Sequence, residues 1–263
     1  MKTHLIKIFP ACLAAVAICM SAHAGEVIAD DSQADILVGP FSSLQTSLDK
    51  PPEWEPLVFK KIKQHTRYEL VSENGTVLVK AVSEAAASGL IRKIQIDPRT
   101  HPIVEWRWKV ANILEKGDVS KKAGDDYAAR IYVSFVYDPT KLSFFERTKY
   151  QTAKMLYGEY PPTGVVNYIW GSHARLDSVI PSPYTKRAMM ISVASGSAKI
   201  GQWVTHRRNV LEDYRKAFQA EPPMISGVAI MTDTDNTGES ATAFYGDIIF
   251  RPASVDSEHI NDK

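Results

Sequence analysis

Two acidic stretches of the sequence carry side chains that could do chemistry. In the first, Asp125 and Asp126 are adjacent, and Arg130 follows four positions after the second acid. Paired carboxylates bind cations, raise each other's pKa or orient a sugar hydroxyl. A charged turn in which Arg130 pairs with one of these acids explains the same residues. The sequence alone leaves both interpretations open.

The second stretch, from Asp233 to Gly238, alternates oxygen-bearing side chains and ends in glycine. This pattern resembles the opening half of a calcium loop, with Asp233 and Asp235 as candidate metal ligands. The closing acid of an EF-hand is missing, because Phe244 stands eleven residues after Asp233. A hairpin turn whose side chains bond their own backbone is the alternative. Calcium is therefore the one cofactor for which the sequence offers ligands.

A further group of polar residues is expected on one open surface. Tyr245 and Asp247 are two positions apart in an expected strand, so they should face the same way. A carboxylate that faces inward needs a partner. Arg107 or Arg130 would supply that partner, and the hypothesis is that Arg107, Arg130 and Asp247 converge on this surface.

A basic group, His206 to Arg208, stands at the start of an expected helix over residues 207–218. The helix dipole favours acids at that position, so Arg208 indicates an anionic partner such as Asp125 or Asp126. Solvated arginines are the alternative.

Tryptophans offer flat surfaces that can stack on sugar rings. Trp170 and Trp203 lie beside glycines in irregular sequence, so we expect them at the rim of a binding surface. Trp106 and Trp108 alternate with charged residues, which predicts that they belong to the core.

Recognised catalytic motifs are missing from the sequence. It contains no GxSxG elbow, HExxH pair, P-loop or glycine-rich dinucleotide fingerprint. Its histidines beyond residue 24 are scattered singly rather than at metal-ligand spacing. No residue is therefore assigned a catalytic role.

The elements that must position these candidates are mostly short strands. The clearest is a hairpin around Asn74-Gly75, a dipeptide that favours a tight primed turn. Alternation and turn residues predict strands at residues 67–71, 76–81, 91–96, 103–110, 127–137, 188–194, 224–232 and 242–250.

Helical spacing predicts two inserted helices, over residues 142–157 and 207–218. Many strands without βαβ alternation predict a mainly β protein, an antiparallel β-sandwich of the jelly-roll type. The two helices would cover an edge of the sandwich.

The N-terminus predicts export. Residues 1–24 combine a basic start, an apolar run too short for a permanent membrane anchor, and an Ala-x-Ala cleavage site. We expect a periplasmic protein with a flexible N-terminus over residues 25–40, one β-sandwich domain over 41–252 and a flexible tail over 253–263. Cys12 and Cys19 would leave with the signal peptide.

Charge excludes some partner classes. Removing two lysines with the signal leaves 31 − 2 = 29 basic against 30 acidic residues, interspersed along the chain. This balance indicates no nucleic-acid partner, and no membrane-spanning segment is expected after cleavage. The oligomeric state is not indicated.

Several motifs together resemble a bacterial family known as domain of unknown function 3047. They are EWRWKV at 105–110, GDDYAAR at 124–130, RNVLEDY at 208–214 and DTDNTG at 233–238. The resemblance spans roughly residues 41–250 and implies an exported protein without assigned catalytic residues. More loosely, FYGDI at 244–248 is similar to galactose-binding-like jelly rolls and carbohydrate-binding modules, a fold likeness.

Three functions remain open. The first is a non-catalytic periplasmic protein that binds a saccharide or other polar ligand on a concave sheet, through the candidate residues above. The second is a polysaccharide-active lyase or hydrolase, with Asp125 or Asp126 as acid and Tyr132 or His206 as base. The third is an envelope structural or interaction protein that docks a partner on the helix over 142–157.

Overall fold

The computed structural model describes residues 34–141, 147, 151 and 161–253, which belong to one compact unit, Ser32–Lys263. The expected signal peptide lies outside the described residues. So do nearly all of the expected helix over 142–157 and the tail from residue 254.

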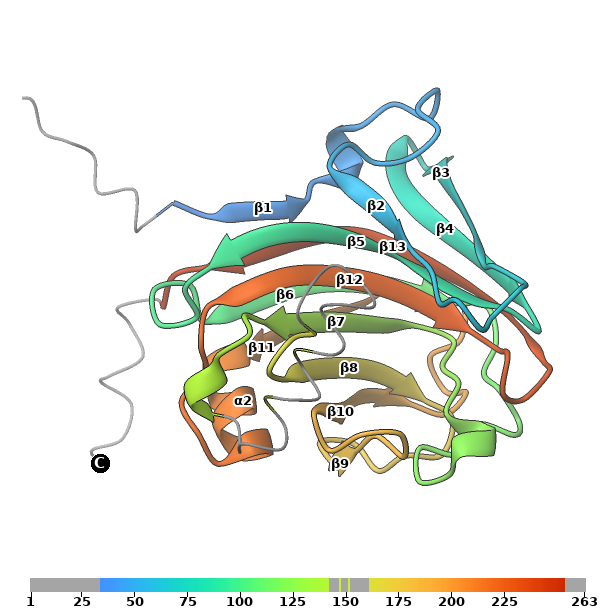
Figure 1. The fold of residues 1–263 in the computed structure, drawn as a ribbon. Helices are drawn as coiled ribbons and strands as arrows, with labels where there is room; N and C mark the ends of the chain where they lie inside the picture. Colours follow the sequence, from blue (N-terminus) through green and yellow to red (C-terminus); the bar gives the residue numbers. More distant parts are fainter. Residues whose placement is uncertain (1–33, 142–146, 148–150, 152–160, 254–263) are drawn as a thin grey trace, which may run out of the picture. The chain divides into compact units, whose positions relative to one another are not determined.

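One layer is a six-stranded antiparallel sheet in the order β11-β6-β13-β4-β3, with β1 also paired to β13 (Figure 1). Its strands are β1 (Ile36–Gly39), β3 (Arg67–Glu73), β4 (Thr76–Glu84), β6 (Ile103–Val110), β11 (Val204–Asn209) and β13 (Ser240–Arg251). Strand β1 lies in the region expected to be flexible, so that expectation is wrong for these residues. The four residues of β1 are too few to show the alternation that marks a strand in the sequence. Val38 of this strand is nevertheless fully buried.

The other layer is a seven-stranded sheet in the order β2-β5-β12-β7-β8-β10-β9, in which β8 and β10 are parallel and the other pairs antiparallel. Its strands are β2 (Trp54–Leu57), β5 (Ala87–Ile96), β7 (Arg130–Phe135), β8 (Val165–Gly171), β9 (Val179–Pro181), β10 (Ala188–Ser195) and β12 (Ile225–Asp233). The two sheets form a sandwich, which confirms the expected mainly β fold.

The core lies between the sheets because each strand turns alternate side chains inward. Trp106 and Trp108 of β6 meet Ile131 and Val133 of β7 in one apolar cluster. A buried aromatic side chain removes roughly 150–250 Å² from water, about 4–6 kcal/mol at 25 cal/mol per Å². The outward side chains of the same strands are left for solvent or a ligand.

One α-helix, α2 (Val210–Phe218), is described, with short 3-10 turns η2 (Phe41–Ser43), η3 (Lys122–Gly124) and η4 (Pro139–Lys141). The expected helix began at residue 207, but residues 207–209 belong to β11. The side chain of Asn209 caps α2 by accepting a hydrogen bond from the backbone of Glu212. Arg208 is thus a strand residue, and the expected conflict with the helix dipole does not arise.

The hairpin at Asn74-Gly75 is confirmed, whereas the stretch from Asp233 to Gly238 is not a hairpin turn, because it joins strands of different sheets. Asn74 and Gly75 have φ values of 50° and 79°, as a primed turn between β3 and β4 requires. The stretch from Asp233 to Gly238 connects β12 to β13, and Gly238 donates its N–H to the Thr234 carbonyl at 2.9 Å. No helix among the described residues is long and apolar enough to cross a membrane.

Candidate functional site

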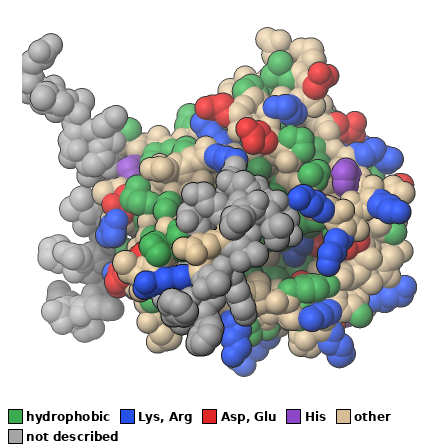
Figure 2. Space-filling model, in the orientation of Figure 1, with side chains coloured by type: hydrophobic (Ala, Val, Ile, Leu, Met, Phe, Trp, Pro, Cys, Tyr) green, Lys and Arg blue, Asp and Glu red, His purple; other side chains and the backbone are tan. Residues whose placement is uncertain are grey.

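The outer face of the seven-stranded sheet carries an open pocket of about 980 Å³. Charged side chains of both signs are interspersed on the face turned to the viewer in Figure 2. The strands β7, β8, β10 and β12 supply the floor, and the segments 58–62, 182–185 and 235–236 supply the rim. The floor residues include Arg130, Tyr132, Asn167, Met190, Met231 and Asp233.

An ion pair between Arg130 and Asp233 is buried in this floor. Both side chains point outward, because the inward positions of β7 and β12 are apolar. The guanidinium carbon lies 5.0 Å from the centre of the Tyr127 ring and 5.1 Å from that of Tyr132. Burial raises the pKa of Asp233, and Arg130 opposes this shift. The charged-turn interpretation had paired Arg130 with Asp125 or Asp126, whereas its partner is Asp233.

Two buried polar atoms of the pocket residues have no hydrogen-bond partner among the described residues. They are Nε of Arg130 and Oδ1 of Asn167. The amide nitrogen of Asn167 donates to the sulfur of Met190 at 3.0 Å, whereas its oxygen accepts no hydrogen bond from the described residues. An unpaired buried polar atom is unfavourable by about 1–3 kcal/mol. A hydrogen bond with a polar ligand that reached either atom would remove this cost.

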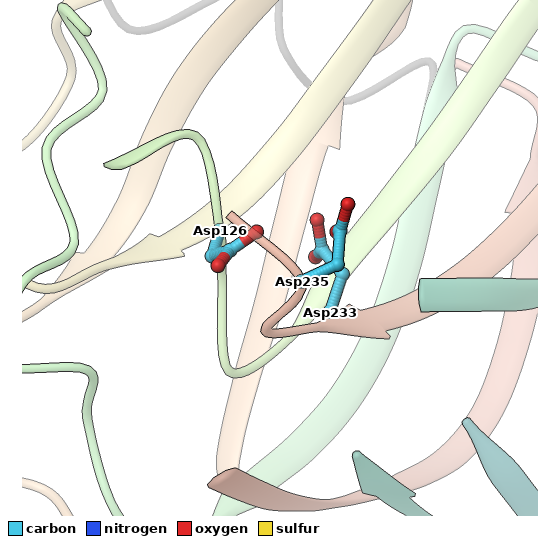
Figure 3. Close-up of side chains that lie close together, drawn as sticks. All are labelled: Asp126, Asp233 and Asp235. Carbon is cyan, nitrogen blue, oxygen red and sulfur yellow. The ribbon is translucent and has the colours of Figure 1, made fainter. Parts of the chain in front are cut away.

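The two acidic stretches meet at one edge of the pocket. One carboxylate oxygen from each of Asp126, Asp233 and Asp235 lies within 4.8 Å of the others (Figure 3). The oxygens of Asp126 accept hydrogen bonds from the backbone of Thr237 at 2.6 Å and from the amide of Asn236 at 3.0 Å. Calcium at Asp233 and Asp235 stays a prediction, and a cation there would share Asp233 with Arg130.

Two further acids of the pocket hold their protons more tightly than usual. Burial raises the pKa of Asp125, and the charges of Asp126 and Asp235 add to the shift. Asp125 accepts a hydrogen bond from the Tyr127 hydroxyl at 2.8 Å. Burial and the neighbouring Asp126 also raise the pKa of Asp235. Such carboxyl groups are suited to donate a proton or a hydrogen bond.

The expected convergence of Arg107, Arg130 and Asp247 is wrong. Arg107 and Asp247 point outward from the six-stranded sheet, and Arg130 points outward from the other sheet, so they lie on opposite surfaces. Arg107 stacks on Trp203 at 4.8 Å, and the Trp203 indole donates to Glu73 at 2.8 Å. These two residues therefore lie away from the pocket.

Asp247 is bound locally rather than at the pocket. It accepts hydrogen bonds from the backbone N–H and the hydroxyl of Ser42, at 2.8 and 2.5 Å. The register of β13 shifts between Tyr245 and Ile248, so Tyr245 and Asp247 do not face the same way. Tyr245 points into the core, where its hydroxyl donates to the Met231 carbonyl at 2.7 Å.

Two other candidates also lie elsewhere. Trp170 is a buried core residue whose indole donates to the Gly196 carbonyl at 3.1 Å, so it forms no rim. The anionic partners of Arg208 are Asp213, at 2.6 Å, and Asp177, at 2.9 Å, rather than Asp125 or Asp126.

Sequence reasoning missed Asn167 and Tyr184. Asn167 is the one amide in the otherwise apolar and aromatic strand β8, and a buried polar residue in such a strand is a signal for a site. Tyr184 lines the pocket as a largely exposed side chain, and its hydroxyl donates to Asn236 at 2.7 Å. No pattern in the sequence around Tyr184 marks it.

Comparisons with known proteins agree with the resemblance noted in the sequence. A family model described as "Protein of unknown function (DUF3047)" matches residues 52–249. A search of curated proteins finds no match.

Two solved structures are similar at low identity. The family 30 carbohydrate-binding module of the cellulosomal cellulase Cel9D-Cel44B of Clostridium thermocellum matches with a TM-score of 0.41 and 10% identity, over 84% of this chain and 99% of that one. The Spr0440 glycoside hydrolase domain, Endo-D, of Streptococcus pneumoniae R6 matches with a TM-score of 0.31 and 8% identity, over 75% and 21%. At these values neither match supports an argument about this chain.

Proposed function

Since the chain belongs to the DUF3047 family, whose description names no activity, we propose from its pocket that it binds a saccharide or similar polyhydroxylated ligand. The ligand occupies the outer face of the seven-stranded sheet, above Arg130 and Asn167.

The observation that carries this proposal is the unpaired donor and acceptor in the pocket residues. Nε of Arg130 needs an acceptor, and Oδ1 of Asn167 needs a donor. A hydroxyl group is both, so a ligand with several hydroxyls satisfies both atoms without introducing a charge. A purely apolar ligand would leave the two atoms unpaired.

The remaining lining supports the same ligand class. The rings of Tyr132 and Tyr184 offer apolar surfaces for the C–H face of a sugar, and Asp125 and Asp235 can orient its hydroxyls. Small-ligand sites combine an apolar lining with a few placed polar groups in this way.

Asn167→Leu tests the proposal because leucine keeps the size of the side chain and removes the unpaired oxygen. We expect the affinity for the best ligand of an oligosaccharide panel, measured by calorimetry, to fall at least about tenfold, the effect of roughly 1.4 kcal/mol. The stability of the ligand-free protein should not fall, since an unsatisfied group is lost.

The matched control is Arg107→Gln, a polar truncation on the opposite sheet, which should bind as the unaltered protein does. If no saccharide binds, or if Asn167→Leu binds as tightly as the unaltered protein, the proposal is wrong.

A second candidate function is a hydrolase or lyase acting on the same ligand. The observation in its favour is the raised pKa of Asp125 and Asp235 beside the pocket, as a general acid needs. Release of reducing ends or unsaturated sugars would reveal it, and Asp125→Asn should abolish that release. If Asp125→Asn retains full turnover, this acid assignment is wrong.

We also propose that residues 1–24 export the protein to the periplasm. Osmotic-shock fractionation should recover it in the periplasmic fraction, with Gly25 as the new N-terminus by sequencing. Recovery in the cytoplasm with Met1 intact would contradict the proposal.

Calcium at Asp233 and Asp235 is proposed as an auxiliary ligand. It would raise the melting temperature of chelator-treated protein, because a ligand selective for the folded state stabilises it. An unchanged melting temperature at millimolar calcium would contradict it.

A further inference from the structure

A second hollow of about 450 Å³ lies on the same sheet face as the pocket. Phe59 and Tyr132 line both spaces, so the two adjoin. The lining of the second hollow is mostly apolar, and it includes Leu57, Ile91, Val136, Pro162, Val165 and Ala229. Together the two spaces form a groove across β5, β12, β7 and β8, which we call the sheet groove.

Polarity changes along the sheet groove. On β12 the outward residues run from Asp233 through Met231 to Ala229. On β7 the charged Arg130 stands at the same end as Asp233, because it is paired in register with Met231. One end of the groove therefore carries the ion pair and the acids, and the other end is lined mostly by apolar side chains, together with Lys93, Ser134, Tyr137 and Ser226.

A small residue leaves space at the apolar end. Ala229 is paired with Tyr132 on one side and Ile91 on the other. A larger side chain at position 229 would occupy space between two residues that line the hollow.

From this arrangement we propose that the ligand is an amphiphilic glycoside, with its sugar at the Arg130 end and an alkyl or acyl chain along the apolar end. The inference rests on the saccharide binding proposed above and names the class of ligand. A free oligosaccharide would leave the apolar end of the groove exposed to water. An alkyl or acyl chain bound there would remove both its own surface and that of the groove from water.

The test measures binding of glucose, of butyl, hexyl and octyl glucoside below their micelle concentrations, and of octanol, to the purified protein by calorimetry. Affinity should rise along the glucoside series by up to roughly fourfold per methylene that enters the groove. Octyl glucoside should bind more tightly than octanol, because only the glucoside reaches the polar end.

Ala229→Leu should remove most of the increase in affinity with alkyl chain length, and it should leave the affinity for glucose unchanged. Ala111→Leu, the same substitution at an exposed position, is the matched control. Ile91→Thr serves as a second variant in case Ala229→Leu does not fold, because threonine keeps the branched β-carbon that favours a strand. It should reduce the gain in affinity per methylene.

Three results would overturn the inference. Equal affinity for glucose and all glucosides would show that the apolar end is unused, and saccharide binding would stand. A chain-length gain that persists unchanged in both groove variants would place the chain elsewhere. Octanol binding as tightly as octyl glucoside would contradict saccharide binding, and the apolar site alone would remain.

Discussion

The ion pair of Arg130 and Asp233 belongs to the proposed binding site and also contributes to the stability of the fold. Both side chains are almost completely buried, and the rings of Tyr127 and Tyr132 lie against the guanidinium. A buried charge that loses its partner is strongly destabilising, whereas loss of both charges is tolerated far better.

Asp233→Ala should therefore lower the free energy of unfolding by about 3–5 kcal/mol, because it leaves Arg130 charged and unpaired in the floor. Urea denaturation measures this change. The double variant Arg130→Met with Asp233→Leu should recover much of the loss.

The control for this prediction is Glu84→Ala. Its pair with Arg67 is 3.7 Å apart with both side chains exposed, so we expect little change. Equal effects at the buried and exposed pairs would contradict the account.

His206 should make the stability of the folded protein depend on pH in the acidic range. Its ring lies 5.2 Å from that of Trp106 and 5.4 Å from that of Trp108. Burial, together with the charges of Lys199 and Arg208, lowers its pKa to about 4. An unfolded histidine has a pKa of about 6.5, so between these values the unfolded chain binds the proton more tightly.

Stability should fall as the pH drops from about 6.5 to about 4, by at most about 3 kcal/mol from this group. Urea midpoints across that range, compared with those of His206→Gln, measure the effect. The urea midpoint of His206→Gln should change less with pH over that range. An NMR titration of His206 with a midpoint near 6.5 would contradict the prediction.

Among the elements, β11 and α2 meet at one capping residue. Asn209 ends the strand and caps the helix, so the chain turns from one element into the other without a loop. Asn209→Ala should lower the free energy of unfolding by about 1 kcal/mol, since the backbone N–H of Glu212 loses its acceptor.

Asn209→Asp, which keeps an acceptor at the cap, is the comparison in the same chemical denaturation experiment. A loss as large as that of the alanine variant would show that the cap contributes nothing.

Strand prediction depended on how each strand is buried. Strand β6 has one wet face, so its alternation of tryptophan with charged residues was visible in the sequence. Strand β8 is buried over nearly its whole length, and such strands read as continuous apolar runs without alternation. It was missed for this reason, and Asn167 with it.

The whole sandwich has one continuous core, to which both sheets contribute. We expect the two layers to unfold together, because the buried apolar residues described outside this shared core form only a small cluster of Tyr127, Ile169 and Met190. Tryptophan fluorescence and far-UV circular dichroism should give coincident urea transitions. Two separated transitions would show that one sheet survives without the other.

The sequence by itself determined the fold class, the hairpin turn at 74–75, and the family. These depend on local patterns: a period of two residues, turn-forming dipeptides and short motifs that are read along the chain. Both acidic stretches and Arg130 were also found in this way, and the structure brings them together at one pocket.

Only the tertiary structure decided which candidates share a surface. Alternation shows that a residue points away from the core, but not from which sheet it points. Arg107 and Arg130 satisfied the same pattern on strands of different sheets, so they lie on opposite sides. The bulge at Tyr245 to Ile248 reversed Asp247 relative to Tyr245 for a related reason, since register depends on the partner strand rather than on the strand's own sequence.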